Sequence, residues 1–251
     1  MAPQSAKSVA LITGGTTGIG FATARLLHEK GYAVLITGTN PETLAAAQRS
    51  LPEEVVVLKA DARSLSDARR IADELKQRFG RVDFVYLNAG VSRMLPLEEV
   101  DEAFFDEHFG INVKGSLFTL QKILPLLSSG ASVLFTTSVG AERGAPNYCV
   151  ALATKGATAA LVPSLAAELA PRGIRVNAIR PGAIDTLAFD KLGLPAEAIA
   201  GFRQMLPQRI PLGRMGVAED IAEVAAFLAS PAARYITGTT IDVDGGFLHA
   251  L

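Results

Sequence analysis

Short apolar runs alternate along the chain with longer stretches in which apolar residues recur every three or four positions. The short runs predict buried parallel strands, and the longer stretches predict amphipathic helices between them. No internal linker, repeat or low-complexity segment interrupts this alternation. We expect strands at 9–12, 33–37, 55–58, 83–87, 132–137, 174–179 and 239–243.

Helix boundaries carry their own signals. Asn40-Pro41-Glu42 supplies an N-cap, a proline at the first helical position and an acid in the first turn. Ser64 and Asp67 fit a capping box in its Asp variant. Residues 104–127 are interpreted as one long helix or as two joined helices.

This order of elements predicts an α/β fold, a doubly wound parallel sheet with helices on both faces. The expected strand order is 3-2-1-4-5-6-7, with right-handed crossovers. The 251 residues suffice for a single domain spanning 1–251. Ligands of such sheets bind beyond the carboxyl ends of the strands, so the loops after the strands are the informative ones.

The first of these loops is rich in glycine. Gly14 permits a tight turn out of the strand, while Gly18 and Gly20 remove side chains where the backbone approaches a pyrophosphate or packs on the sheet. Free N–H groups at the start of the next helix then face the phosphate. A purely structural turn is the alternative. The predicted contacts to a dinucleotide are Gly14, Thr16, Thr17, Gly18, Ile19 and Gly20.

Composition removes several classes of partner. Hydrophobic residues make up 49% of the chain and the net charge is -1, which argues against a nucleic-acid partner. Charge, glycine or proline interrupts the apolar runs, so no membrane span is expected. The start, Met1–Lys7, leads directly into the first strand and predicts no signal peptide. The single Cys149 excludes an internal disulfide, so we expect a cytoplasmic protein, and no metal site is predicted.

The spacing Thr13-Gly-x-x-x-Gly-Ile-Gly20 resembles that of the short-chain dehydrogenases/reductases, and the resemblance extends from Val9 to Gly246. It implies a Rossmann fold in which an Asp-Ala pair contacts the adenine and an Asn-Ala-Gly turn packs under the cofactor. It also implies that a Pro-Gly loop holds the nicotinamide carboxamide. A helix cap and two generic turns are the plain alternatives. The further cofactor residues implied are Asp61, Ala62, Asn88, Ala89, Gly90, Lys155, Pro181, Gly182, Ile184 and Thr186.

The loop after the second strand bears on the choice of cofactor. It contains no acid that would accept from the adenosine ribose and repel a 2′-phosphate. It also lacks the arginine found in many NADP-dependent relatives. Thr39, Asn40 and the following helix start could still receive a phosphate through hydroxyl and N–H groups. We therefore expect NADP, with a neutral site that also accepts NAD as the alternative.

The resemblance also implies a catalytic Asn, Ser, Tyr and Lys. The Asn matches Asn112, expected to hold a helix kink and a proton-relaying water. The Ser matches Ser138, a donor to the substrate carbonyl, and the Lys matches Lys155, which binds the nicotinamide ribose. The Tyr should stand four residues before the Lys, on the same helix face. That position is Ala151, which carries no titratable group.

Two explanations for Ala151 remain open. One is a recent or engineered Tyr→Ala substitution, favoured because Asn112, Ser138 and Lys155 are intact. The other is a natural member that has lost its activity. Tyr148 precedes Lys155 by seven residues, so its hydroxyl would enter roughly 5 Å along the helix axis from the required place. We expect Tyr148 to line the substrate mouth or to pack, and Cys149 is a poorer candidate.

A substrate lid is expected at 186–212. Few charges lie near its mouth, which favours an apolar ketone or secondary alcohol. The predicted activity is an NADP-dependent carbonyl reductase or alcohol dehydrogenase, here impaired. A non-catalytic dinucleotide-binding sensor or regulatory subunit is the alternative, and the resemblance implies a homotetramer. The apolar residues of the lid are Leu187, Phe189, Leu192, Leu194, Phe202, Met205 and Leu206.

Overall fold

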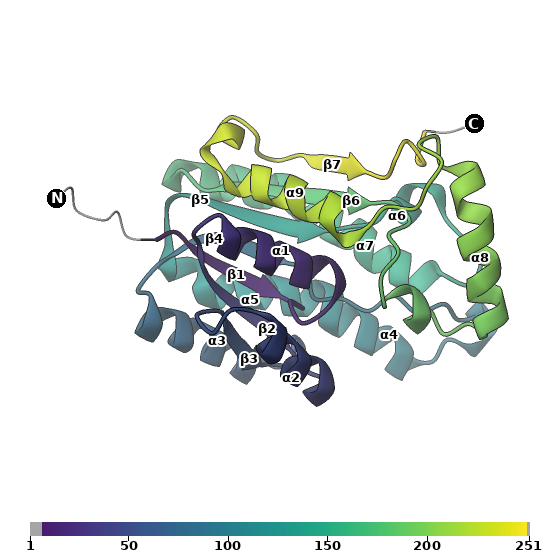
Figure 1. The fold of residues 1–251 in the computed structure, drawn as a ribbon, viewed down its shortest axis with the longest axis horizontal. Helices are drawn as coiled ribbons and strands as arrows, with labels where there is room; N and C mark the ends of the chain where they lie inside the picture. The colour runs from purple at the N-terminus through teal and green to yellow at the C-terminus, as the bar shows by residue number, and fades with distance from the viewer. Residues whose placement is uncertain (1–6, 250–251) are drawn as a thin grey trace.

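A seven-stranded parallel sheet in the order β3-β2-β1-β4-β5-β6-β7 forms the centre of the computed structural model (Figure 1), which confirms the predicted fold class and strand order. The structure describes residues 7–249, so the expectation about the N-terminal segment falls mostly outside the described part. The strands are β1 (Val9–Thr13), β2 (Ala33–Gly38), β3 (Val56–Lys59), β4 (Val82–Leu87), β5 (Leu127–Thr136), β6 (Arg175–Pro181) and β7 (Thr240–Val243).

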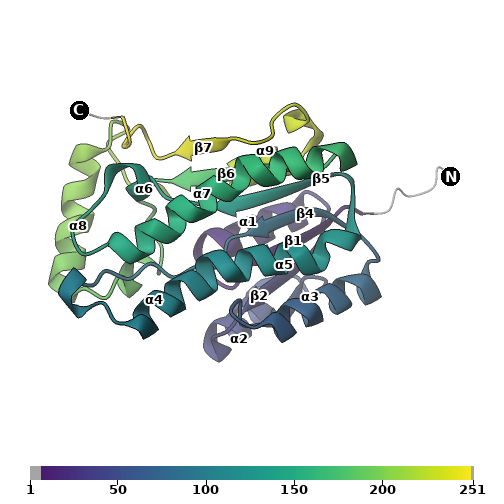
Figure 2. The ribbon, with the colours of Figure 1, turned by 180° about the vertical axis from the view of Figure 1, so that it is seen from behind.

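Helices cover both faces of the sheet, as Figures 1 and 2 show. One layer contains α1 (Gly18–Glu29), α2 (Pro41–Ser50) and α9 (Ala218–Ala229). The opposite layer contains α3 (Leu65–Arg78), α5 (Ser116–Ile123) and α7 (Cys149–Leu169). Successive strand side chains point to opposite faces, so Leu11 joins the core under α3 and Ile12 the core under α1.

Three further helices stand beyond the carboxyl ends of the strands: α4 (Glu102–Phe109), α6 (Gly140–Arg143) and α8 (Ala196–Arg209). The sequence analysis did not predict α6 or α8. Of the two alternatives for 104–127, the structure shows two α-helices, α4 and α5. A wider π-helical turn, Gly110–Gly115, joins them without a break.

The predicted helix caps form, with one difference. The Asn40 side chain accepts from the N–H groups of Glu42 and Thr43. Ser64 accepts from the Asp67 N–H at 3.1 Å, but the Asp67 carboxylate accepts from the Asp61 N–H at 2.7 Å instead of returning to Ser64. Only half of the predicted capping box is therefore present, because the Asp67 carboxylate satisfies the backbone at the end of β3.

One helical stretch bears on the expectation that no segment of the chain spans a membrane. Cys149–Arg172 is long and apolar enough to cross a membrane by length and composition alone. Its α7 part contributes Val162, Ala166 and Leu169 to the core beneath the sheet. A core helix of a water-soluble domain passes the same test, because burial demands the same apolar composition as lipid does.

Two glycines in helices should respond oppositely to alanine. A Cβ on Gly20 would lie 2.3 Å from the Gly14 carbonyl oxygen, whereas a Cβ on Gly156 meets nothing within 4 Å. We expect Gly20→Ala to lower the free energy of unfolding by about 1–3 kcal/mol. Gly156→Ala should raise it by about 0.5–1 kcal/mol. Urea unfolding followed by circular dichroism measures both, and equal effects at the two positions would contradict the expected close packing at Gly20.

Candidate functional site

A cleft with a volume of about 350 Å³ opens at the carboxyl ends of β1 to β5. Its position is the one expected for a ligand of a doubly wound sheet. The cleft brings together most of the residues predicted for the cofactor. These are Gly14, Thr16, Thr17, Gly18, Ile19, Thr39, Asn40, Asp61, Ala62, Asn88, Ala89, Gly90, Lys155 and Thr186.

Four predicted cofactor residues do not line this cleft. Gly20 packs on the Gly14 carbonyl, and Gly182 packs on Asp244, whose Cα would lie 2.7 Å from an added Cβ. Pro181 is buried at the end of β6, and Ile184 lines a separate hollow beside Gly216.

The sequence analysis missed a further set of lining residues. About half of them lie at the carboxyl end of a strand or in the loop after it, a signal that the predicted strand ends could have supplied, and the rest come from helices or from the segment after Thr186. The full set is Thr13, Thr37, Gly38, Thr43, Ala60, Ile71, Val91, Ser92, Ile111, Thr119, Thr136, Ala188 and Lys191.

Asn88 joins the ends of β1 and β4 beneath the cleft. Its side-chain amide donates to the carbonyl oxygens of Thr13 and Gly14, at 3.2 and 3.1 Å. The Thr13 hydroxyl in turn accepts from the N–H groups of Asn88 and Ala89. Reciprocal bonds of this kind satisfy backbone groups that the sheet leaves unpaired and fix the glycine turn relative to β4.

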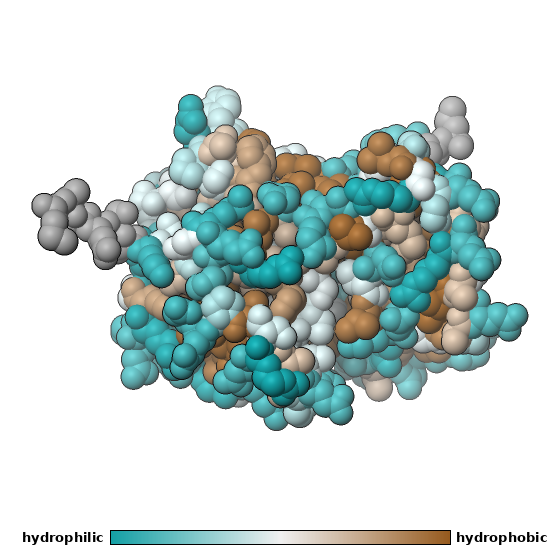
Figure 3. Space-filling model, viewed as in Figure 1, coloured by the Kyte–Doolittle hydropathy of each residue, from teal (hydrophilic) through white to brown (hydrophobic). Residues whose placement is uncertain are grey.

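At the β2 end, the cleft is lined by hydroxyl and amide groups and by no basic side chain. The hydroxyls of Thr16 and Thr43 lie 3.1 Å apart, and Thr39 and Asn40 complete this wall. Asn40 caps α2, so two of the N–H groups expected to face a phosphate are already bonded. In Figure 3, a pale band of intermediate hydropathy crosses the middle of the face shown.

The carboxylate of Asp61 is held by Arg63 and does not cap the following helix. Arg63 Nη2 lies 2.7 Å from the Asp61 carboxylate, and the Arg63 N–H donates to it as well. The Arg63 side-chain hydrogen bond is the main cause that lowers the pKa of Asp61. Ser64 caps α3 instead, so the alternative reading of Asp61 as a helix cap is wrong.

Asn112 occupies the π-helical turn and connects three elements. Its Oδ1 accepts from the Val91 N–H at 2.8 Å, and its Nδ2 donates to the Val91 carbonyl at 2.8 Å and to Thr154 Oγ1 at 2.7 Å. π-Helical turns are frequent at functional sites. Both amide hydrogens and the oxygen of this buried side chain therefore hold the loop after β4 against α7.

Lys155 lies beside this junction, with its ammonium group in the cleft wall. Its Nζ donates to the Thr136 carbonyl at 3.1 Å, and a Cβ on Gly90 would lie 3.4 Å from it. Burial lowers the pKa of Lys155 to about 8, since desolvation disfavours the charged form. A ligand that accepts a hydrogen bond from the ammonium would stabilise the charged form and raise the pKa of Lys155 again.

Ser138 and Ala151 complete the predicted catalytic set. Ser138 Oγ accepts from the Gly140 N–H at 3.2 Å, and Ser138 does not belong to the residues that line the cleft. Ala151 is buried and presents only a methyl group, while its carbonyl accepts from Thr154 Oγ1 at 2.6 Å. Position 151 therefore offers no proton.

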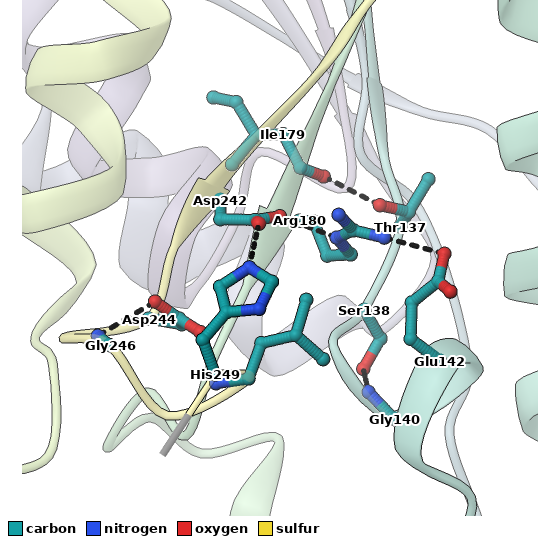
Figure 4. Close-up of polar contacts among 11 residues, drawn as sticks. Thr137, Ser138, Gly140, Glu142, Ile179, Arg180, Asp242, Asp244, Gly246 and His249 are labelled. Carbon is teal, nitrogen blue, oxygen red and sulfur yellow. Dashed lines mark hydrogen bonds and ion pairs between the residues drawn. The ribbon is translucent and has the colours of Figure 1, made fainter.

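Charged residues fasten the helix that follows Ser138. Arg180 donates to Glu142 on α6 at 2.6 Å and to Asp242 on β7 at 2.5 Å, as drawn in Figure 4. His249 approaches Asp242 at 3.4 Å. The sequence analysis did not find this network, because its members are separated by up to a hundred residues.

Tyr148 stands at the start of α7, and its hydroxyl lies 2.5 Å from Ser92 Oγ. Ser92 lines the cleft, whereas Tyr148 is not one of the lining residues. Burial raises the pKa of Tyr148, and the bond with Ser92 partly opposes this. Cys149 is exposed.

Known proteins resemble this chain over nearly its whole length. The enoyl-(acyl carrier protein) reductase family matches residues 14–248. Oxidoreductase asL5 of Sarocladium schorii is 38% identical over 94% of each chain. A short-chain dehydrogenase/reductase (glucose/ribitol dehydrogenase) from Brucella melitensis is 35% identical, with a TM-score of 0.86 over 96% of each chain. The 3-ketoacyl-(acyl-carrier-protein) reductase of that organism, complexed with NADH, is 32% identical, with a TM-score of 0.88 over 96% of this chain and 98% of its own.

This chain belongs to the short-chain dehydrogenase/reductase family, whose members are oxidoreductases that bind a nicotinamide dinucleotide. The resemblance found in the sequence motifs is thereby confirmed at the level of the family and of the fold.

The lowered pKa of Lys155 makes a prediction about stability. Between about pH 8 and pH 10.5, the folded chain has released this proton while the unfolded chain retains it, so stability rises with pH across that window. Below it, both states hold the proton and the folded state bears the full cost of burying the charge. We expect Lys155→Met to raise the melting temperature at neutral pH, with a gain that shrinks above pH 8.

The melting temperatures of the unmodified chain and of Lys155→Met, measured without dinucleotide from neutral pH to about pH 10.5, test this prediction. A difference in stability that does not change with pH would contradict a lysine desolvated in the folded state.

Proposed function

We propose that this chain is an NADP-dependent oxidoreductase that interconverts a carbonyl compound and a secondary alcohol, and that Ala151 slows it. The observation that carries this proposal is the placing of the Lys155 ammonium in the cleft wall, beside Asn112. A structural protein would have no reason to bury an ammonium group at this edge of the sheet, since its desolvation is costly.

The dinucleotide fits the residues that line the cleft. Glycine at 14, 18 and 90 leaves the backbone bare, and a side chain on Gly90 would project at Lys155 and Asn112. When bound, the reduced nicotinamide supplies hydride to the carbonyl carbon. Lys155 would hold the ribose hydroxyls, and its neighbour Thr154 would be kept in place by Asn112.

Ser138 would donate to the substrate carbonyl oxygen and polarise it. Its hydroxyl has the Gly140 N–H as donor, which leaves its own proton free for a substrate. In relatives of the usual pattern, a phenol four residues before the lysine gives the proton. Ala151 cannot replace it, so the proton-transfer step should limit the rate.

The uncharged wall at the end of β2 favours NADP. No acid stands at 37–40 to repel a 2′-phosphate, and hydroxyls from Thr16, Thr39 and Thr43 could bond it. The NADH in the Brucella reductase makes NAD the alternative.

The substrate is proposed to be an apolar ketone or secondary alcohol, bound under a lid at 186–212. The lid contains α8, and Leu187 near its start is 55% exposed. Exposed Phe105 and Phe227 support assembly into a homotetramer, and a cytoplasmic location remains part of the proposal.

Ala151 also favours a second candidate, a non-catalytic dinucleotide-binding protein that acts as a sensor or regulatory subunit. Such a protein would keep the cleft and dispense with proton transfer.

Restoring the phenol separates these candidates. Ala151→Tyr should raise the rate of ketone reduction with NADPH by about 10²–10⁴-fold, because general acid catalysis contributes that much. The dissociation constant for NADPH should not change, since Ala151 is absent from the cleft lining. Steady-state kinetics on a panel of ketones and fluorescence titration measure the two quantities. An inactive variant with normal NADPH binding would favour the sensor.

Opposite charges at one position test the cofactor. Thr39→Asp should weaken NADP binding relative to NAD by on the order of tenfold, through repulsion of the 2′-phosphate. Thr39→Arg should shift the same ratio the other way. Dissociation constants for both nucleotides on each variant provide the test, and two variants that move the ratio in one direction would contradict the assignment.

A further inference from the structure

Two hydroxyls lie near the start of α7, the helix on which the family's phenol is missing. Ser92 Oγ and Tyr148 OH lie 2.5 Å apart, within the range of a strong O–H···O hydrogen bond. Tyr148 precedes Ala151 by three residues at the start of α7. A phenol at 148 is displaced by about a helical turn from the required place, whereas its hydrogen-bond partner Ser92 lies in the cleft lining.

Asn112 ties the Ser92 loop to the Lys155 helix. One Nδ2 group donates both to the carbonyl of Val91, which precedes Ser92, and to the hydroxyl of Thr154, which precedes Lys155. Ser92 and Lys155 therefore face one cleft from neighbouring walls. We therefore expect a carbonyl compound bound in this cleft to come within reach of the Ser92 hydroxyl.

The backbone around Tyr148 is held in an unusual conformation. Asn147 has a φ of 62° and is the one residue other than glycine with positive φ among residues 7–249. Its carbonyl accepts from the Leu95 N–H at 2.6 Å. A left-handed backbone costs free energy outside glycine and persists where its surroundings enforce it, often at functional sites. The start of α7 is thus fixed against the loop that carries Ser92.

We propose that Tyr148, acting through Ser92, supplies the proton for a slow carbonyl reduction by the chain as it stands. This inference rests on the proposed function. The carbonyl oxygen, negatively charged once its carbon has gained hydride, takes the proton from Ser92 Oγ. The Ser92 O–H bond breaks as the O–H bond of the product alcohol forms. Ser92 then takes the Tyr148 proton, and the phenolate regains one from water.

This relay works better as an acid than as a base. Burial raises the pKa of the Tyr148 phenol, so it keeps its proton at neutral pH. It can donate to an alkoxide, which is far more basic, but it cannot readily accept a proton from an alcohol.

Four variants test the relay: Tyr148→Phe, Ser92→Ala, Ala151→Tyr and the control Tyr235→Phe, which makes the same change at a fully exposed tyrosine. With NADPH and a ketone panel, Tyr148→Phe and Ser92→Ala should each lower the residual reduction rate by about tenfold or more. Tyr235→Phe should not change it. In the Ala151→Tyr background, Tyr148→Phe should cost less than about threefold, because the two phenols then act in place of one another.

A second measurement needs neither dinucleotide nor turnover. Spectrophotometric titration of the phenols should show one buried tyrosine fewer in Tyr148→Phe. In Ser92→Ala the same tyrosine should titrate at higher pH, because the Ser92 hydrogen bond lowers its pKa. Ser92→Ala keeps the aromatic ring, so it tests the coupling even where Tyr148→Phe folds poorly.

The outcomes distinguish this inference from the function beneath it. An unchanged residual rate in Tyr148→Phe, or an unmoved phenol pKa in Ser92→Ala, overturns the relay. A chain that is inactive until Ala151→Tyr restores it overturns the relay and leaves the proposed function standing. If neither the unmodified chain nor Ala151→Tyr is active and neither binds a dinucleotide, the relay and the proposed function are both overturned.

Discussion

The carboxamide of Asn112 is the contact on which the site depends. It is buried in a π-helical turn and bonds Val91 through both its oxygen and its nitrogen. Its nitrogen also bonds Thr154 on α7. A buried amide left without partners would cost more than its bonds gain, so these three elements have one favourable arrangement. That arrangement places Gly90, Ser92 and Lys155 around one cleft.

The ammonium group of Lys155 is the main charge in the part of the cleft that Asn112 organises. Lys155 donates to a carbonyl oxygen and forms no ion pair with a carboxylate among residues 7–249, and burial lowers its pKa. The charged form is therefore poised to be stabilised by a ligand with hydroxyls or phosphate.

The far wall of the site is held in a different way. Arg180 joins Glu142 and Asp242 and so fastens α6, which follows Ser138, to the end of the sheet. The side chains of Arg180 and Asp242 are 17% and 25% exposed, so water and salt screen this pair less than a surface pair, whereas Glu142 is 57% exposed. In the glycine-rich turn after β1, close backbone packing fixes the structure instead, because there is no room for a side chain at Gly20 against the Gly14 carbonyl.

The sequence by itself determined the fold and the location of the cleft, because strand and helix periodicities and the glycine spacing are local properties. It also determined the caps at Asn40 and Ser64 and the absence of a phenol at 151. Only the tertiary structure decided which residues face the cleft: Gly182 and Ile184 of the predicted motifs do not, whereas Ser92, which belongs to no predicted motif, does. It likewise decided the partners of Arg180 and Tyr148. The physical reason is that a side chain chooses among neighbours brought together by folding, and those neighbours lie tens of residues away along the chain.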